Sequence, residues 1–139
     1  MPPELYAHPF SSYCQKVLIA LYENAIPFTC RLIQFQDEAD NRALKAVWPL
    51  KRFPVLVDDG RTVIESSVII EYLQRVHPDS GRLIPDDPDT ALDVRFMDRV
   101  FDNYIMTPMQ RIVSDRLRPE DAHDPVGVQQ ARDLLDLTY

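Results

Sequence analysis

Residues 54–66, PVLVDDGRTVIES, form the clearest local pattern in the chain. Two runs of strand-forming residues, at 55–57 and 62–65, flank an Asp-Asp-Gly-Arg stretch that is typical of a tight turn, so we predict a β-hairpin. The residues that follow, 66–77, place apolar side chains three and four positions apart and begin with two serines that can cap a helix. The centre of the chain is therefore expected to be a hairpin followed directly by a helix.

Upstream of the hairpin, strand and helix signals alternate. PELYAHP at 3–9 indicates a short strand, and residues 13–24 have the apolar spacing of a helix. FTCRLIQF at 28–35 is rich in strand formers, whereas 37–49 begins with acidic residues and ends at a proline, as a helix does. The predicted order over residues 1–77 is strand, helix, strand, helix, hairpin, helix, which is an α/β unit.

Downstream, the composition changes. Residues 78–88 are rich in Pro, Asp, Gly and Ser and are expected to be a linker, and 89–139 carry helical apolar spacing. We expect a long helix with a kink at Pro108 and then a second helix over 126–137. Because one or two helices cannot bury their apolar faces alone, this part is expected to be a partial helical domain. It must pack against the first unit, another chain or residues outside this sequence.

The composition of the chain argues against several classes of function. The 139 residues are 45% hydrophobic and 27% charged, as in a soluble globular protein, and the net charge of -7 argues against general affinity for nucleic acids or anionic membranes. With no apolar run long enough for a membrane span and no leader pattern, we expect a cytoplasmic protein. The two cysteines and three histidines lack metal-ligand spacing, so no metal site is predicted.

The segment HPFSSYC, at 8–14, has the spacing of a redox CxxC motif with a hydroxyl in place of the first thiol. Two interpretations are open for Ser11 and Ser12: they cap the helix, or one of them donates a hydrogen bond to a thiolate that a ligand brings. Cys14, one turn into the helix, is expected to be a small buried apolar residue. We place His8 in a surface turn.

Two further places in the sequence are candidate ligand-binding sites. Pro54 directly precedes a strand whose apolar residues otherwise predict a central strand, a place where proline is disfavoured. The Phe53–Pro54 bond is therefore either trans on an edge strand or cis beside an extended ligand. Glu65 and Ser66 lie at a junction of strand and helix, where they either cap the helix or bind a ligand's ammonium and carboxylate groups. The predicted topology brings both places and Ser11 to one end of the sheet.

Taken together over residues 4–77, these motifs resemble the glutathione transferase family, in particular its serine-type zeta, theta and beta-like bacterial branches. The resemblance implies a thioredoxin-like domain of βαβαββα order followed by the beginning of the family's all-α second domain. It implies glutathione as co-substrate, attack of its thiolate on a small electrophile, and a homodimer. Because that family lines its electrophile site largely with the second domain, binding can survive where turnover does not.

The resemblance also assigns roles to residues around the sulfur of glutathione. Ser11 aligns with the family's catalytic serine and is expected to hydrogen-bond the sulfur. Ser12 and Tyr6 are rivals for that role, although the position of Tyr6 favours the core. The main chain of Phe53, beside a cis Pro54, is expected to pair with the cysteinyl part.

At the two ends of the tripeptide, charged and polar residues are expected. Glu65 and Ser66 are assigned to the γ-glutamyl end, and Lys51 or Arg52 to the glycyl carboxylate. Two alternatives stand beside this function. One is a non-catalytic module that keeps the fold and dimerises through the long helix, and the other is a glutathione-dependent reductase that uses Cys14.

Overall fold

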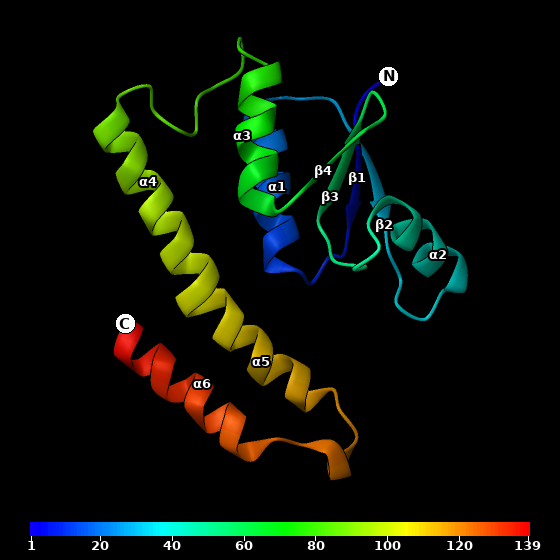
Figure 1. Ribbon diagram of the computed structural model, residues 1–139, viewed down its shortest axis with the longest axis vertical. Coiled ribbons are helices and arrows are strands. Elements are labelled where there is room, and N and C mark those ends of the chain that lie inside the picture. Colours follow the sequence, from blue (N-terminus) through cyan, green and yellow to red (C-terminus); the bar gives the residue numbers. More distant parts are fainter. The chain divides into compact units, whose positions relative to one another are not determined.

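The computed structural model describes residues 1–139 and divides into two compact units, Met1–Pro85 and Asp86–Tyr139 (Figure 1). The division falls inside the range 78–88 that was expected to be a linker. The first unit contains every strand of the chain and three helices, whereas the second is built from helices alone.

The first unit has the predicted βαβαββα order. Its elements are β1 (Glu4–Ala7), α1 (Ser12–Glu23), β2 (Thr29–Leu32), α2 (Glu38–Val47), β3 (Val55–Asp58), β4 (Arg61–Ile64) and α3 (Ser66–Val76). The α/β class and the thioredoxin-like arrangement expected from the sequence are therefore confirmed for this unit.

The four strands form one mixed sheet in the order β2-β1-β3-β4. β1 runs parallel to β2 and antiparallel to β3, and β3 and β4 form the predicted hairpin. Asp59 and Gly60 at the hairpin turn have φ angles of 46° and 78°. Two successive positive φ angles suit the right-handed twist of the flanking strands, which explains the Asp-Gly pair in the sequence.

The sheet is covered on both faces, with α1 and α3 on one side and α2 on the other (Figure 1). Because side chains alternate along a strand, β1 supplies residues to both sides. Leu5 and Ala7 join the larger core, and Tyr6 joins the smaller core under α2. The larger core comprises Leu5, Ala7, Cys14, Val17, Leu21, Ile26, Leu56, Val63, Ile69 and Leu73.

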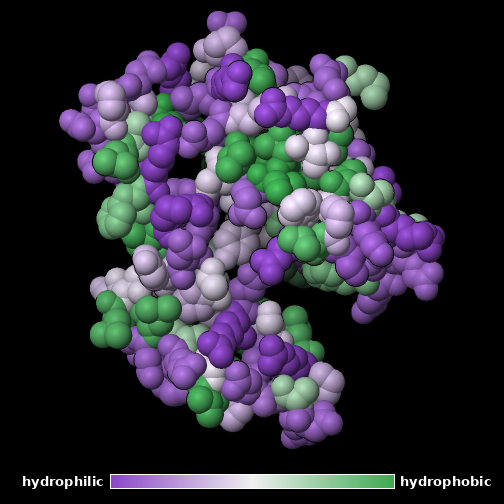
Figure 2. Space-filling model, in the orientation of Figure 1, coloured by the Kyte–Doolittle hydropathy of each residue, from purple (hydrophilic) through white to green (hydrophobic).

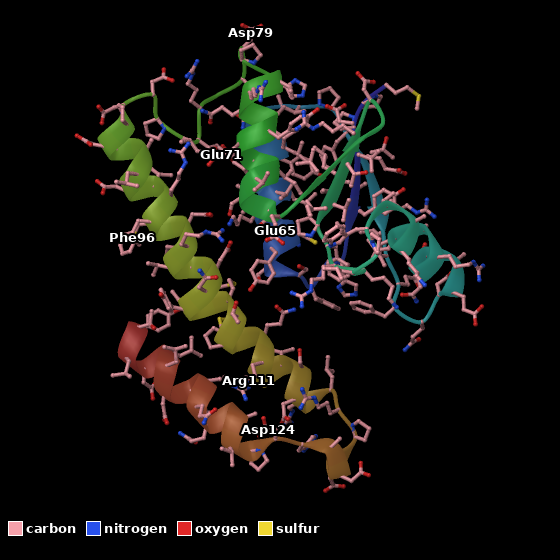
Figure 3. The ribbon with its side chains drawn as sticks, in the orientation of Figure 1. Glu65, Glu71, Asp79, Phe96, Arg111 and Asp124 are labelled. Atoms are coloured by element: carbon pink, nitrogen blue, oxygen red, sulfur yellow. The ribbon has the colours of Figure 1, made fainter.

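The second unit consists of α4 (Pro88–Val100), a π-helical turn (Phe101–Met106), α5 (Thr107–Arg116), a short 3-10 turn (Glu120–Ala122) and α6 (Pro125–Thr138). α6 packs along α5 (Figure 1). Asp124 caps α6 by accepting a hydrogen bond from the Gly127 N–H at 2.9 Å, and it pairs with Arg111 of α5 at 3.3 Å (Figure 3). The capping aspartate thus ties the start of α6 to its neighbour.

The predicted long helix is interrupted just before Pro108 by the π-helical turn. A proline cannot donate the hydrogen bond that continues an α-helix, so the turn before it must change its pairing. The Thr107 N–H donates to the carbonyl of Asp102, five residues back, and the Thr107 hydroxyl donates to the same carbonyl at 2.8 Å. The structure thus adapts to Pro108 by a change of helical register.

The second unit exposes many large apolar side chains, and apolar patches are visible on its surface in Figure 2. They include Leu92, Phe96, Phe101, Val113, Leu117, Val126 and Leu137. This agrees with the expectation that a few helices, predicted as one or two, cannot bury their apolar faces alone. None of the helices combines the length and apolar character that crossing a membrane requires.

Candidate functional site

Ser11 is the N-cap of α1, where its backbone is extended. Its Oγ accepts a hydrogen bond from the Cys14 N–H at 3.3 Å, and its own N–H donates to the His8 carbonyl at 3.1 Å. The residue is 9% exposed. Because the helix N–H occupies an acceptor position of the hydroxyl, the hydroxyl proton can be directed toward an incoming anion. The N-terminus of α1 also carries the positive end of the helix dipole.

Cys14 lies fully buried beneath Ser11 in the larger core. Burial raises the pKa of its thiol, an effect that hydrogen bonding with Ser11 and the His8 backbone opposes only in part. The thiol therefore stays protonated near neutral pH and is a poor nucleophile. This environment supports the interpretation of Cys14 as a core residue and disfavours the reductase alternative.

The two rivals of Ser11 lie in different surroundings. Ser12 is the first residue of α1 and is exposed, so it can reach solvent but does not cap the helix. Tyr6 is buried in the smaller core, where the Arg31 guanidinium stacks over its ring at 5.4 Å. Burial raises the pKa of the Tyr6 hydroxyl, and the Glu4 carboxylate adds to that effect. The surroundings of Tyr6 are therefore those of a core residue.

The Phe53–Pro54 peptide bond is cis, the isomer that the family resemblance implied and that the sequence alone left open. Pro54, which directly precedes β3, is buried, and Phe53 is half-buried. Lys51 and Arg52, just before them, are exposed. Lys51 has a φ of 51° and donates its backbone N–H to the Trp48 carbonyl at 2.9 Å.

Glu65 precedes α3 with a φ of 69° and a ψ of 119°, a conformation that a non-glycine residue rarely adopts (Figure 3). Its side chain is exposed and does not cap the helix. Ser66, the first residue of α3, is 5% exposed. Strained residues of this kind are concentrated at functional sites, where the surrounding structure holds them in place.

The strand register brings the three predicted places to one end of the sheet. Tyr6 near the end of β1 lies opposite Val55 at the start of β3, and Val55 lies opposite Ile64 at the end of β4. Consequently the loop to Ser11, the Phe53–Pro54 bond and the Glu65–Ser66 junction all lie at the same end of the sheet. The N-termini of α1 and α3 lie there too.

Two features at this end of the sheet were not predicted from the sequence. Lys16 of α1 places its Nζ 3.0 Å from the hydroxyl of Ser67, the second residue of α3, and so adds a cation between the two helix starts. The His8 ring also contacts the rings of Phe10, Phe35 and Phe53 and forms an aromatic cluster with them. The sequence signal for this cluster is the phenylalanine in each of the loops that follow β1, β2 and α2.

Residues 5–81 match the family described as the glutathione S-transferase N-terminal domain. The chain is similar to a probable maleylacetoacetate isomerase of Caenorhabditis elegans, with 36% identity over 86 residues that cover 62% of this chain and 40% of that protein. It is also similar to glutathione S-transferase U10 of Arabidopsis thaliana, with 31% identity over 123 residues that cover 88% of this chain and 50% of that protein. The chain thus spans half or less of the length of both relatives.

Among solved structures, a glutathione S-transferase from Methylobacillus flagellatus KT with GSH bound matches with a TM-score of 0.89. The sequence identity is 26%, and the match covers 98% of this chain and 66% of that chain. The likeness therefore extends over both units of the protein.

Proposed function

Because the chain belongs to the glutathione S-transferase family, we propose that it binds glutathione and promotes attack of the glutathione thiolate on a small electrophile. The observation that carries the proposal is the convergence of Ser11, the Phe53–Pro54 bond and Ser66 at one end of the sheet. The GSH bound in the similar solved structure supports the choice of ligand.

In this proposal Ser11 is the catalytic residue. Its hydroxyl donates a hydrogen bond to the glutathione sulfur at the N-terminus of α1, and the thiol proton leaves to solvent. Lowering the pKa of the thiol by two units corresponds to about 2.7 kcal/mol of anion stabilisation. A hydrogen bond to a charged group contributes about 1.5–3 kcal/mol and a helix terminus about 0.3–1 kcal/mol, so their sum of about 1.8–4 kcal/mol spans the required value.

The remaining proposed contacts hold the tripeptide. The main chain of Phe53 pairs with the cysteinyl part, beside Pro54. The Ser66 hydroxyl and N–H bind the γ-glutamyl carboxylate at the start of α3, and Glu65 binds the ammonium group. Lys51 is proposed for the glycyl carboxylate because its ammonium group is exposed in the loop before Phe53.

Titration calorimetry with glutathione tests the site. Replacing Glu65 by Gln removes the charge that faces the ammonium group and is expected to weaken glutathione binding about tenfold. Glu23→Gln, at an exposed position near the far end of α1, is the matched control and should leave the affinity unchanged. An intact wild-type protein that takes up no glutathione would rule the proposal out.

We also propose a cytoplasmic homodimer. The exposed apolar side chains of the second unit support self-association, and the free thiols Cys14 and Cys30 fit a reducing compartment. The same apolar surface favours a second candidate function, a non-catalytic dimerisation module. Light scattering together with a conjugation assay separates the two, because the module predicts self-association without conjugation of any electrophile.

A further inference from the structure

A cavity of about 340 Å³, here called the α1–β2 cavity, lies where α1 ends and β2 begins. Its lining includes Leu21, Ile26, Pro27 and the rings of Tyr22 and Phe28. The loop that joins the two elements lies at the end of the sheet that carries the N-terminus (Figure 1). Ser11 precedes Leu21 by ten residues, so about 15 Å of helix separates the cavity from the proposed glutathione site. Its volume is within the range of about 300–1,000 Å³ that is usual for small-molecule sites.

The backbone around the α1–β2 cavity is held by hydrogen bonds. The Ala25 N–H donates to the Tyr22 carbonyl, and the Ile26 N–H donates to the Leu21 carbonyl, both at 3.0 Å. Ala25 has a φ of 50°, the left-handed conformation with which many helices end. On the other side of the cavity, β2 pairs with β1 along its whole length. Because the backbone is already fixed, a ligand that enters the cavity has little of the chain left to order.

Two aromatic rings meet at the cavity. The ring of Tyr22, from the last turn of α1, lies 5.3 Å from the ring of Phe28, directly before β2, and the two are inclined by 75°. Tyr22 is 70% exposed, so its side chain is accessible from solvent. The face of an aromatic ring carries negative charge density and attracts an ammonium group. The pair therefore favours a cationic group at this side of the cavity.

The charges at this end of α1 also favour a cation. A helix C-terminus carries about half a negative elementary charge, and the last turn of α1 contains no basic residue to offset it. The exposed Glu23 carboxylate adds a negative charge next to Tyr22 in the sequence. The Cys30 thiol in the lining stays neutral near pH 7, because burial raises its pKa. Arg31 stacks over Tyr6 in the smaller core, on the other face of the sheet.

We propose that the α1–β2 cavity is a second ligand site, which binds a small organic cation: an ammonium group attached to an apolar body. The apolar body is buried against Leu21 and Ile26. The ammonium group contacts the rings of Tyr22 and Phe28 and is attracted by the Glu23 carboxylate and the C-terminus of α1. The site is separate from the proposed glutathione site and does not depend on glutathione binding.

Protection of Cys30 from alkylation measures occupancy of the cavity. Cys30 is exposed, whereas Cys14 is fully buried, so iodoacetamide at mildly alkaline pH should label Cys30 alone, at a rate that mass spectrometry follows. Benzyltrimethylammonium is the cationic probe, and benzylsulfonate, an anion of similar size, is its counterpart. The cation should slow the labelling of Cys30 in a saturable manner, and the anion should leave the rate unchanged. An unchanged rate with the cation, or equal protection by the anion, would overturn the proposal.

Two variants test the contacts of the ammonium group. Tyr22→Leu removes the ring but keeps an apolar side chain, and Glu23→Gln removes the charge. Each should weaken the affinity for benzyltrimethylammonium, measured as the concentration that halves labelling, about two- to fivefold. Phe35→Leu, which removes a 60% exposed ring from the loop after β2, is the matched control with unchanged affinity.

Cys14 serves as an internal check of folding in these variants, because a folded chain keeps it unlabelled. An affinity in folded Tyr22→Leu equal to that of the wild type would refute the proposal. Calorimetry with glutathione is a separate measurement, so the glutathione site and the α1–β2 cavity can each fail without the other.

Discussion

Replacing Ser11 by Ala separates the two tasks that its hydroxyl performs. As a helix cap, Oγ accepts the Cys14 N–H at 3.3 Å, a long hydrogen bond, so its loss should lower the free energy of unfolding by only about 0.5–1 kcal/mol. As a donor to the glutathione thiolate, its removal should cost about 1.5–3 kcal/mol. That cost raises the pKa of the bound thiol by about 1–2 units.

The assay is a pH titration of the thiolate absorbance of glutathione bound to each variant, with kcat/KM followed over the same pH range. Because removal of the donor raises the pKa, the rising limb of the rate profile should move to higher pH in Ser11→Ala. Ser12→Ala, at the next residue, should leave the rising limb at the same pH as in the wild type. A bound thiol whose pKa is the same in Ser11→Ala as in the wild type would refute the assignment.

Three other predictions concern the thiol, the core and the second unit. Because burial raises the pKa of Cys14, the wild type and Cys14→Ser should be equally inactive in a disulfide-exchange assay, and activity lost in the variant would contradict this. Leu56→Ala, at a fully buried position in β3, should lower the free energy of unfolding by about 2–5 kcal/mol in urea titrations, whereas a loss below 1 kcal/mol would argue against the described packing. The Gly127 N–H, and to a lesser extent Arg111, hold the pKa of Asp124 below its ordinary value of 3.8. This cap should therefore stabilise α6 at neutral pH and lose that effect as the pH falls through the lowered pKa, which circular dichroism would detect as a decrease in Tm that Asp124→Asn does not share.

Sequence periodicity was sufficient to predict the helices and strands of the first unit, because these elements depend on local signals. The helix predicted at 13–24 is observed at Ser12–Glu23, and the hairpin strands lie where alternating β-branched residues surround Asp59 and Gly60. Capping residues and turn glycines affect the backbone only within a few positions. The helix or turn that they specify can therefore be predicted without knowledge of the rest of the chain.

By itself, the sequence determined the order of elements and the closeness of three motifs at one end of the sheet, and it left open whether Ser11 or Ser12 caps the first helix. The tertiary structure alone decided the cis form of the Phe53–Pro54 bond, the unusual φ of Glu65 and the aromatic cluster around His8. The aromatic cluster joins His8, Phe35 and Phe53, which are distant in sequence and lie in the loops that follow β1, β2 and α2. A local pattern allows several backbone and ring geometries, and packing against those distant residues selects one of them.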